Sequence, residues 1–266
     1  INRSNFTVTI DSKTISFDCV FNTVHGTPGE NGLLQAYFEL LQIPHTTCGF
    51  YQAALTFNKR DLISVLKPYG IKTAENYFLN KGDSINPGKI IEKLGLPCFV
   101  KANKAGSSFG ITKVKREEDF IPAVKEALKE DDEVLIESFL DGMEVSVGVI
   151  QYKGEVLALP VTEIVSENEF FDYEAKYLGK SQEITPARLS PEQTQQVQEI
   201  AKKIYIKLKM KGFTRSEFIF HNNEPHFIEI NTTPGLSAAS ILPQQAKAAG
   251  ISLQDLYGSA IEAALE

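Results

Sequence analysis

Hydrophobic and polar residues alternate through residues 212–231, and this stretch predicts a β-hairpin. Residues 212–220 read Gly-Phe-Thr-Arg-Ser-Glu-Phe-Ile-Phe, a polar His-Asn-Asn-Glu follows, and residues 225–231 read Pro-His-Phe-Ile-Glu-Ile-Asn. Two apolar-rich runs around a polar turn are typical of a hairpin. Side chains return to the same face of a strand every second residue. We therefore expect Arg215 and Glu217 to share a face on the first strand, and Glu229 and Asn231 on the second.

The register of this hairpin decides whether the two pairs can meet. An odd-numbered turn or a bulge places Glu217 opposite Glu229 and Arg215 opposite Asn231, whereas an even turn sends the pairs to opposite faces. Two carboxylates directly opposite each other repel, so the first register favours a cation between them. Oxygen ligands with room for water and phosphate suit magnesium. The alternative is a solvated strand face on which Arg215 forms a surface ion pair.

Two glycine-rich segments follow predicted strands and could hold an anion. Residues 7–24 predict a strand, residues 25–32 form a turn with three glycines, and residues 33–41 have the apolar spacing of a helix. A plain tight turn would explain these glycines but does not need His25. Residues 98–101 and 111–115 predict strands around a loop at 102–110, with Lys101 at its root. This loop could fold over phosphates, although it lacks the Walker sequence and a simple hairpin loop is the alternative.

The remaining pattern predicts further helices and a mainly antiparallel sheet. Helices are expected at residues 58–70, 191–209, 240–249 and 252–265, and strands at 133–140, 144–150 and 155–161. Lys59 lies in the first turn of the first of these helices. A domain seam is expected near residue 141, where a nucleotide base could bind through backbone groups and Glu137. The polar residues 163–186 include four aromatic side chains and predict a lid loop.

Composition narrows the class of protein. The chain has 266 residues, 42% of them hydrophobic and 23% charged, which is ordinary for a globular protein. Its net charge of −7 argues against a nucleic-acid binder, which would be basic. No run is long enough to cross a membrane. The three cysteines, Cys19, Cys48 and Cys98, are far apart and odd in number, so we expect them to be reduced in a cytoplasmic protein.

Five motifs together resemble the D-alanine–D-alanine ligase family of ATP-grasp enzymes. They are the His-Gly-x-x-Gly-Glu-x-Gly at 25–32, Lys101 with the loop at 106–110, the lid sequence at 171–177, residues 212–217, and the Glu-x-Asn-Thr-x-Pro-Gly at 229–235. The resemblance implies an α+β ATP-grasp fold, in which the last two domains grip ATP. It divides the chain into a partial N-terminal α/β domain at 1–58, a central domain at 59–140 and a C-terminal domain at 141–266 that carries the lid at 163–186.

The resemblance implies that ATP phosphorylates the carboxylate of one D-alanine and that the amine of a second D-alanine attacks the acyl phosphate. The nucleotide would be bound by Lys59, Lys101, Lys176, Glu137, Ser138, Leu140 and Glu144. Two magnesium ions, or manganese in their place, would be held by Glu217, Glu229 and Asn231. Arg215 and the Gly235 amide would stabilise developing charge. The substrates would contact His25, Ser240 and Ile241.

The lid sequence indicates which acceptor the enzyme would use. In similar ligases a tyrosine at the position of Tyr177, hydrogen-bonded to a serine at the position of Ser107, accompanies an amine acceptor. The chain departs from the family pattern in three places, because Glu217 stands where aspartate is usual, Ala102 replaces a proline, and no glycine-rich loop with its glutamate precedes His25. We expect roughly 60 to 70 upstream residues to supply that loop. The resemblance also implies a homodimer.

Two other readings remain open. Another ATP-grasp ligase would join a different carboxylate and amine, or use D-lactate or D-serine as the acceptor. A regulatory protein would bind the nucleotide without catalysis, but it would not need both lysines, Arg215 and all three metal-site positions.

Overall fold

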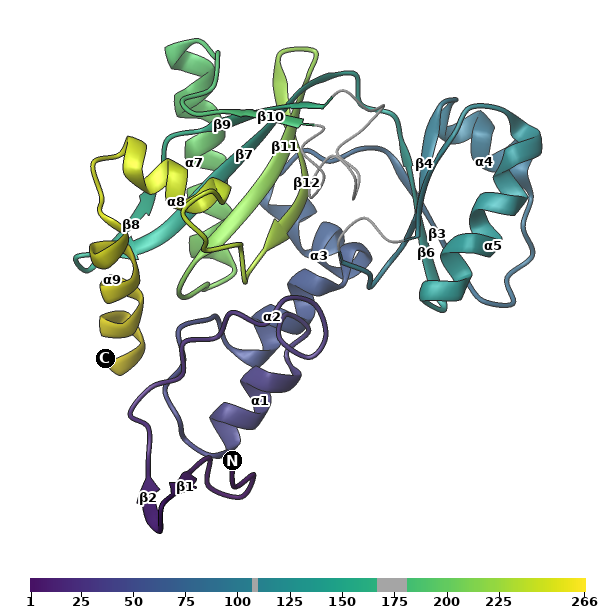
Figure 1. Cartoon of the computed structure of the whole chain (residues 1–266). Helices are drawn as coiled ribbons and strands as arrows, with labels where there is room; N and C mark the ends of the chain where they lie inside the picture. Colours follow the sequence, from purple (N-terminus) through teal and green to yellow (C-terminus); the bar gives the residue numbers. More distant parts are fainter. Residues whose placement is uncertain (107–109, 167–180) are drawn as a thin grey trace.

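The computed structural model describes residues 1–106, 110–166 and 181–266 (Figure 1). Within these ranges the strands form a two-stranded sheet, a four-stranded sheet in the order β3-β6-β4-β5, and a six-stranded sheet in the order β10-β9-β7-β11-β12, with β8 paired to β7. All strand pairings described are antiparallel. The predicted α+β class is confirmed. No helix in these ranges is both long and apolar enough to span a membrane.

The predicted strand at residues 7–24 is wrong. β1 (Val8–Ile10) and β2 (Lys13–Ile15) form a short hairpin, because Asp11 and Ser12 turn the chain with φ angles of 47° and 64°. The alternation here does not mark a buried face, since most of these side chains are exposed. Farther along, the expected strand is reduced to a single parallel bridge between Val20 and His45. The helices α1 (Leu33–Leu40) and α2 (Phe50–Phe57) follow.

The helix expected at residues 58–70 is present as α3 (Lys59–Leu66) and a 3₁₀ turn, η1 (Lys67–Tyr69). The Asn58 side chain caps its N-terminus by accepting a hydrogen bond from the Asp61 amide at 3.1 Å. Gly70 ends it with a φ of 73°, a conformation that glycine adopts without strain. The Asn58 N-cap and the Gly70 C-terminus define the helix and fix the position of Lys59 at its start.

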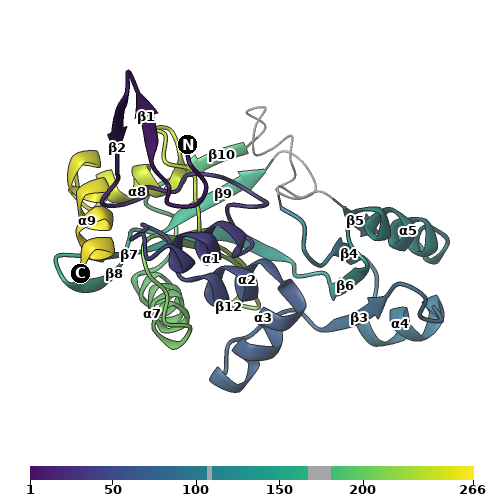
Figure 2. The same ribbon diagram turned by 90° about the horizontal axis from the view of Figure 1, so that it is seen from below.

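The four-stranded sheet carries helices on one side only. Its strands are β3 (Asn76–Asn80), β4 (Cys98–Ala102), β5 (Ile111–Val114) and β6 (Glu133–Ser138). The helices α4 (Pro87–Leu94) and α5 (Phe120–Glu130) lie on the side away from the larger sheet, as Figures 1 and 2 show, and η2 (Glu117–Asp119) precedes α5. Val100 and Ile136 pack under these helices. Lys101 and Glu137 therefore project from the opposite face, toward the larger sheet.

The six-stranded sheet consists of β7 (Gly142–Tyr152), β8 (Glu155–Ala158), β9 (Thr162–Ser166), β10 (Ser181–Ile184), β11 (Thr214–His221) and β12 (Glu224–Asn231). The helix predicted at 191–209 is α7 (Pro191–Lys207), and the two C-terminal helices are α8 (Ile241–Ala248) and α9 (Leu253–Leu265). The lid prediction for residues 163–186 is wrong at both ends, because β9 and β10 pair with each other there. Residues 167–180 lie outside the described residues.

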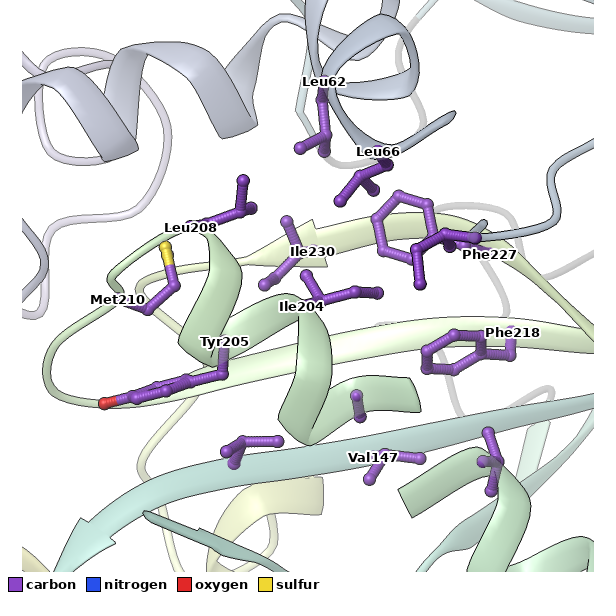
Figure 3. Close-up of a cluster of buried hydrophobic side chains, with 14 of the residues drawn as sticks. Leu62, Leu66, Val147, Ile204, Tyr205, Leu208, Met210, Phe218, Phe227 and Ile230 are labelled. Atoms are coloured by element: carbon purple, nitrogen blue, oxygen red, sulfur yellow. The ribbon is translucent and has the colours of Figure 1, made fainter. Parts of the chain in front are cut away.

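The two faces of this sheet differ in character. On one face a hydrophobic core packs between the sheet, α7 and α3, with Phe218, Phe227, Ile204, Leu62 and Leu66 all within it (Figure 3). Burying side chains of this size contributes roughly 1.5–3 kcal/mol each. The opposite face carries α8 and α9 over part of its area, and polar side chains over the rest. The packed face thus holds the polar face in a fixed geometry.

Candidate functional site

The register predicted for the β11–β12 hairpin is confirmed, but a bulge produces it. Glu217 pairs with Glu229, and Arg215 pairs with Asn231. The turn itself has two residues, an even number, because His221 pairs directly with Glu224. The register then shifts between Glu217 and Phe218, where β12 contributes one extra residue. The four predicted side chains consequently share one face of the sheet.

Arg215 and Glu217 form a buried ion pair on that face. The Arg215 Nε donates to the Glu217 Oε1 at 2.7 Å, and the two side chains are only 14% and 5% exposed. Burial would lower the pKa of Arg215, but the carboxylates of Glu217, Glu229 and Glu183 outweigh it and raise that pKa. Arg215 is therefore charged at any physiological pH. Because the pair is buried, the solvated strand face is excluded.

The carboxylate of Glu217 has spare capacity for a cation. Its Oε2 is buried, and it has no hydrogen-bond partner among the described residues. A buried anionic oxygen without a partner costs considerable free energy, and a metal ion would remove that cost. Within the described ranges no group of three or more histidine, cysteine, aspartate or glutamate side chains is arranged to hold a metal. The donor set of Glu217, Glu229 and the Asn231 amide thus fits magnesium only if other oxygen ligands complete the coordination.

A pocket lies between the four-stranded and six-stranded sheets. Its empty volume is about 790 Å³, which includes space open to solvent. It brings together eight of the predicted residues from elements far apart in the sequence: Lys59, Lys101, Glu137, Ser138, Leu140, Glu144, Glu217 and Glu229, of which Lys59 and Glu229 also line the next pocket. Apolar walls come from Ala74, Phe99, Ile111, Ile219 and Ile228.

Lys101 provides positive charge on one wall of this pocket. Its Nζ donates to the Glu137 Oε2 at 2.5 Å, and both side chains are buried. Burial alone would lower the pKa of Lys101, but Glu137 and, at longer range, Glu229 and Glu144 raise it. The charged Lys101 side chain lies between apolar walls and faces carboxylates on the other sheet. This arrangement suits a phosphate group bound together with a metal ion.

Lys59 faces the same space from α3. Its Nζ donates to the Ala105 carbonyl at 2.7 Å, which joins the helix to the root of the glycine-rich loop. Asn103 strengthens this junction, because its Oδ1 accepts from the Arg60 amide at 2.8 Å and its Nδ2 donates to Glu133 at 2.8 Å. The start of α3 and the loop are therefore held together.

His25 lines a second, adjoining pocket. This pocket is bordered by Lys59, Arg215, Glu229 and Asn231. The His25 Nδ1 lies 3.6 Å from the Glu30 Oε1, and this neighbouring carboxylate raises the pKa of His25. The predicted glycine-rich turn thus brings an imidazole beside the Arg215 side of the site.

The start of α8 brings together Gly235, Ser240 and Ile241, which line neither of the two pockets. Ser240 is its N-cap, and the Ser240 Oγ lies 2.9 Å from the Ser237 Oγ. A Cβ on Gly235 would lie only 2.8 Å from the Ser240 Oγ, so Gly235 and Ser240 are in close contact. Ile241 is buried and packs against Ile164 of β9. Gly235, Ser240 and Ile241 are therefore neighbours, as the sequence motif requires.

Three predicted residues, Ser107, Lys176 and Tyr177, lie outside the described residues. Sequence reasoning missed the apolar walls of the first pocket, although the alternation from Glu217 to Ile219 was a usable signal. It also missed two side chains that line neither pocket: Gln245 of α8, which is hydrogen-bonded to β7, and Glu183 of β10, whose negative charge acts on Arg215. Neither belongs to a recognisable motif, and their neighbours are distant in the sequence. Cys19, Cys48 and Cys98 are free thiols, as predicted.

Comparisons with known proteins identify the family of this chain. The family model described as D-ala D-ala ligase C-terminus matches residues 65–262. The chain is 74% identical to a D-alanine–D-alanine ligase of Christiangramia forsetii over 265 residues, which cover all of this chain and 81% of the relative. It is 67% identical to the ligase of Flavobacterium johnsoniae, with coverage of 100% and 82%.

Solved structures show the same similarity. A D-Ala:D-Ser ligase of Enterococcus faecalis has a TM-score of 0.87 at 33% identity, with 99% of this chain and 77% of that chain covered. A D-alanine–D-alanine ligase of Bacillus anthracis, solved with ATP, has a TM-score of 0.81 at 28% identity, with coverage of 93% and 79%. The predicted resemblance is confirmed, and the chain belongs to the D-alanine–D-alanine ligase family of ATP-dependent ligases.

Proposed function

We propose that the pocket between the two sheets binds ATP and that the adjoining pocket, near Arg215 and α8, is where two D-alanine molecules are joined. ATP-dependent ligation of D-alanine is the activity of the family. The observation that carries the site assignment is the position of Lys101 on one sheet, facing Glu217 and Glu229 on the other across one pocket.

The cationic side chains position and neutralise the nucleotide. Lys101 and Lys59 bind phosphate oxygens, and Lys176 does so from the lid. Glu137, with the backbone at Ser138 and Leu140, binds the adenine base. Glu144 on β7 binds the ribose. Phosphoryl transfer asks a protein mainly for positioning and charge neutralisation, which these residues supply.

Glu217, Glu229 and Asn231 would hold two magnesium ions, with manganese as the substitute. The metal, when bound, supplies positive charge that neutralises the phosphates during transfer. Support comes from the partnerless buried Oε2 of Glu217 and from the register that sets the two carboxylates opposite each other. Glu217 also keeps Arg215 in place through its other oxygen.

Arg215 acts on the substrate side of this site. The D-alanine carboxylate accepts the phosphoryl group and becomes an acyl phosphate, which the amine of the second D-alanine attacks. Arg215 and the Gly235 amide stabilise the negative charge of the acyl phosphate and of the tetrahedral intermediate. His25 lies beside the first D-alanine. Ser240 and the Ile241 amide, at the N-terminus of α8, bind the carboxylate of the second.

The lid residues and the assembly complete the proposal. Tyr177 and Ser107 favour an amine acceptor over a hydroxyl acceptor. The ligase works as a homodimer in the cytoplasm, where its free thiols remain reduced.

The test measures ADP formation by the full-length protein with ATP and magnesium, with and without D-alanine, and identifies the product by mass. We expect D-alanine-dependent ADP formation and D-alanyl-D-alanine as the product. D-lactate and D-serine are supplied in parallel as acceptors, and a preference for either at neutral pH would overturn the acceptor assignment. Lys101→Met should raise the KM for ATP at least tenfold, whereas Lys81→Met, at an exposed lysine distant from the pocket, is the matched control.

A further inference from the structure

Glu183 on β10 lies on the same face of the sheet as the proposed catalytic residues, although no motif includes it. The register runs across the sheet from Glu183 to Ile164, from Ile164 to Glu144, and from Glu144 to Ile219. Directly paired residues project to the same face, and Ile219 is two residues from Glu217. The Glu183 carboxylate therefore belongs to the face that bears Glu217.

Glu183 contacts the helix that we propose binds the second substrate. The Gln244 Nε2 donates to the Glu183 Oε2 at 3.4 Å and to the Ala239 carbonyl at 2.6 Å. The Gln244 amide in turn donates to the Ser240 carbonyl, which closes the first turn of α8. Ile164, the partner of Glu183 in the sheet, packs against Ile241. The Glu183 carboxylate is thus hydrogen-bonded to the first turn of α8.

The charge of Glu183 is incompletely balanced. Burial raises its pKa most, the positive charge of Arg215 opposes this shift, and the negative charge of Glu217 adds to it. Within residues 1–106, 110–166 and 181–266, its hydrogen-bond partner is a neutral amide and no cation lies within ion-pair distance. A bound cation beside it would recover the free energy lost to desolvation.

The second substrate brings such a cation. An α-amino acid has its ammonium and carboxylate on the same carbon atom, so a carboxylate held by Ser240 and Ile241 leaves the ammonium close to the start of α8. Arg215 cannot bind that ammonium because like charges repel. A hydroxy acid such as D-lactate has no positive charge at this position and gains nothing from a nearby carboxylate.

We propose that Glu183 is a specificity-determining residue that binds the ammonium group of the second D-alanine and so favours an amino acid over a hydroxy acid as the acceptor. This inference rests on the proposed function of the α8 end of the site. It is separate from the role of the lid, because Glu183 acts from the sheet. A charge-assisted hydrogen bond of this kind is about twice as strong as a neutral one.

The experiment compares wild-type full-length ligase with Glu183→Gln and Glu183→Asp. Initial rates over a wide range of D-alanine concentrations separate the KM of the first D-alanine from that of the second. We expect Glu183→Gln to raise the second KM about tenfold, while the KM for ATP and for the first D-alanine change less than twofold. Glu183→Asp keeps the charge and should give an intermediate second KM. Glu155→Gln, at an exposed position on β8, is the matched control.

A competition assay with equal D-alanine and D-lactate adds a second readout. The ratio of D-alanyl-D-lactate to D-alanyl-D-alanine should rise in Glu183→Gln. An unchanged second KM together with an unchanged product ratio would overturn the proposal, as would a parallel rise in all three KM values. If Glu183→Gln does not fold, the same measurements on Glu183→Asp test the proposal. Absence of D-alanine-dependent ADP formation by the wild type would refute the proposed function itself, whatever the variants show.

Discussion

Gln245 of α8 provides the sharpest prediction about how the fold positions the site. Along its length β7 pairs with β9 at residues 144–146 and with β8 at residues 149–152. Between these two pairings the Gln245 side chain takes the place of a strand. Its Oε1 accepts from the Gly148 amide at 3.0 Å, and its Nε2 donates to the Ser146 carbonyl at 2.8 Å and to the Thr162 Oγ1 at 3.0 Å. The Gln245 side chain is fully buried.

Gln245→Leu keeps the approximate volume but removes all three hydrogen bonds. Thr162 retains its contact with the Thr185 Oγ1 at 2.6 Å, whereas the Gly148 amide and the Ser146 carbonyl each lose their hydrogen bond to this side chain. Each buried group left unsatisfied costs about 1–3 kcal/mol, so the two groups together cost about 2–6 kcal/mol. For a protein of this size, a loss in that range lowers Tm by roughly 4–24 °C.

The assay follows thermal unfolding by fluorescence at a fixed scan rate, with Gln196→Leu on the exposed surface of α7 as the control. A second readout is the KM for the second D-alanine, which should rise because Gln245 anchors the helix that begins at Ser240 and Ile241. A Tm loss below about 2 °C for Gln245→Leu would refute the reasoning, since it would mean that water or backbone movement satisfies the freed groups. If Gln245→Leu is destabilised but its KM for the second D-alanine is unchanged, Gln245 contributes to stability and does not position the substrate site.

Three further predictions follow from individual contacts. Arg215→Met should leave ATP affinity within about twofold by calorimetry while it abolishes turnover, and an equal loss of both would show that the arginine is structural. The Arg188 guanidinium lowers the pKa of Glu163 in the folded protein. The ion pair therefore stabilises the fold fully when the pH is above the pKa that Glu163 has in the unfolded chain. This stabilisation is lost as the pH falls through the lower pKa of the folded protein. The Tm difference between wild type and Glu163→Gln should therefore shrink from about pH 7 to about pH 4, and a constant difference would contradict it. The buried Tyr205 hydroxyl donates to the Gly212 carbonyl at 2.9 Å, so Tyr205→Phe should cost about 1 kcal/mol in urea unfolding, and an unchanged midpoint would show that the bond contributes nothing.

The sequence predicted those elements in which the hydrophobic pattern and the burial agree. In β11 and β12 the alternation separates a packed face from a polar one, and in α3 a capping asparagine and a final glycine mark both ends. The same alternation at residues 7–24 was misleading, because its apolar side chains remain largely exposed. Periodicity indicates a buried face only when another element covers that face, and the local sequence does not contain this information.

The candidate site was predictable as far as its residues stand in local motifs. Lys101, Arg215 and Glu229 were found in this way, and the fold brings them to the edges of two adjoining pockets. Gln245 and Glu183 were not found, because their partners lie about 60 to 100 residues away along the chain. Such contacts depend on how the sheet and α8 pack, which a reading of single segments does not supply.

The bulge in β12 explains how one hairpin serves both the core and the site. Phe218 and Phe227 pair near the turn and both enter the hydrophobic core. In a regular hairpin with the observed two-residue turn, Ile228 would then lie opposite Glu217, and Glu229 would point into the core. The extra residue instead sets Glu229 opposite Glu217, and Ile228 lines both pockets. One added residue thus places an apolar wall and a carboxylate side by side on the same face of the sheet.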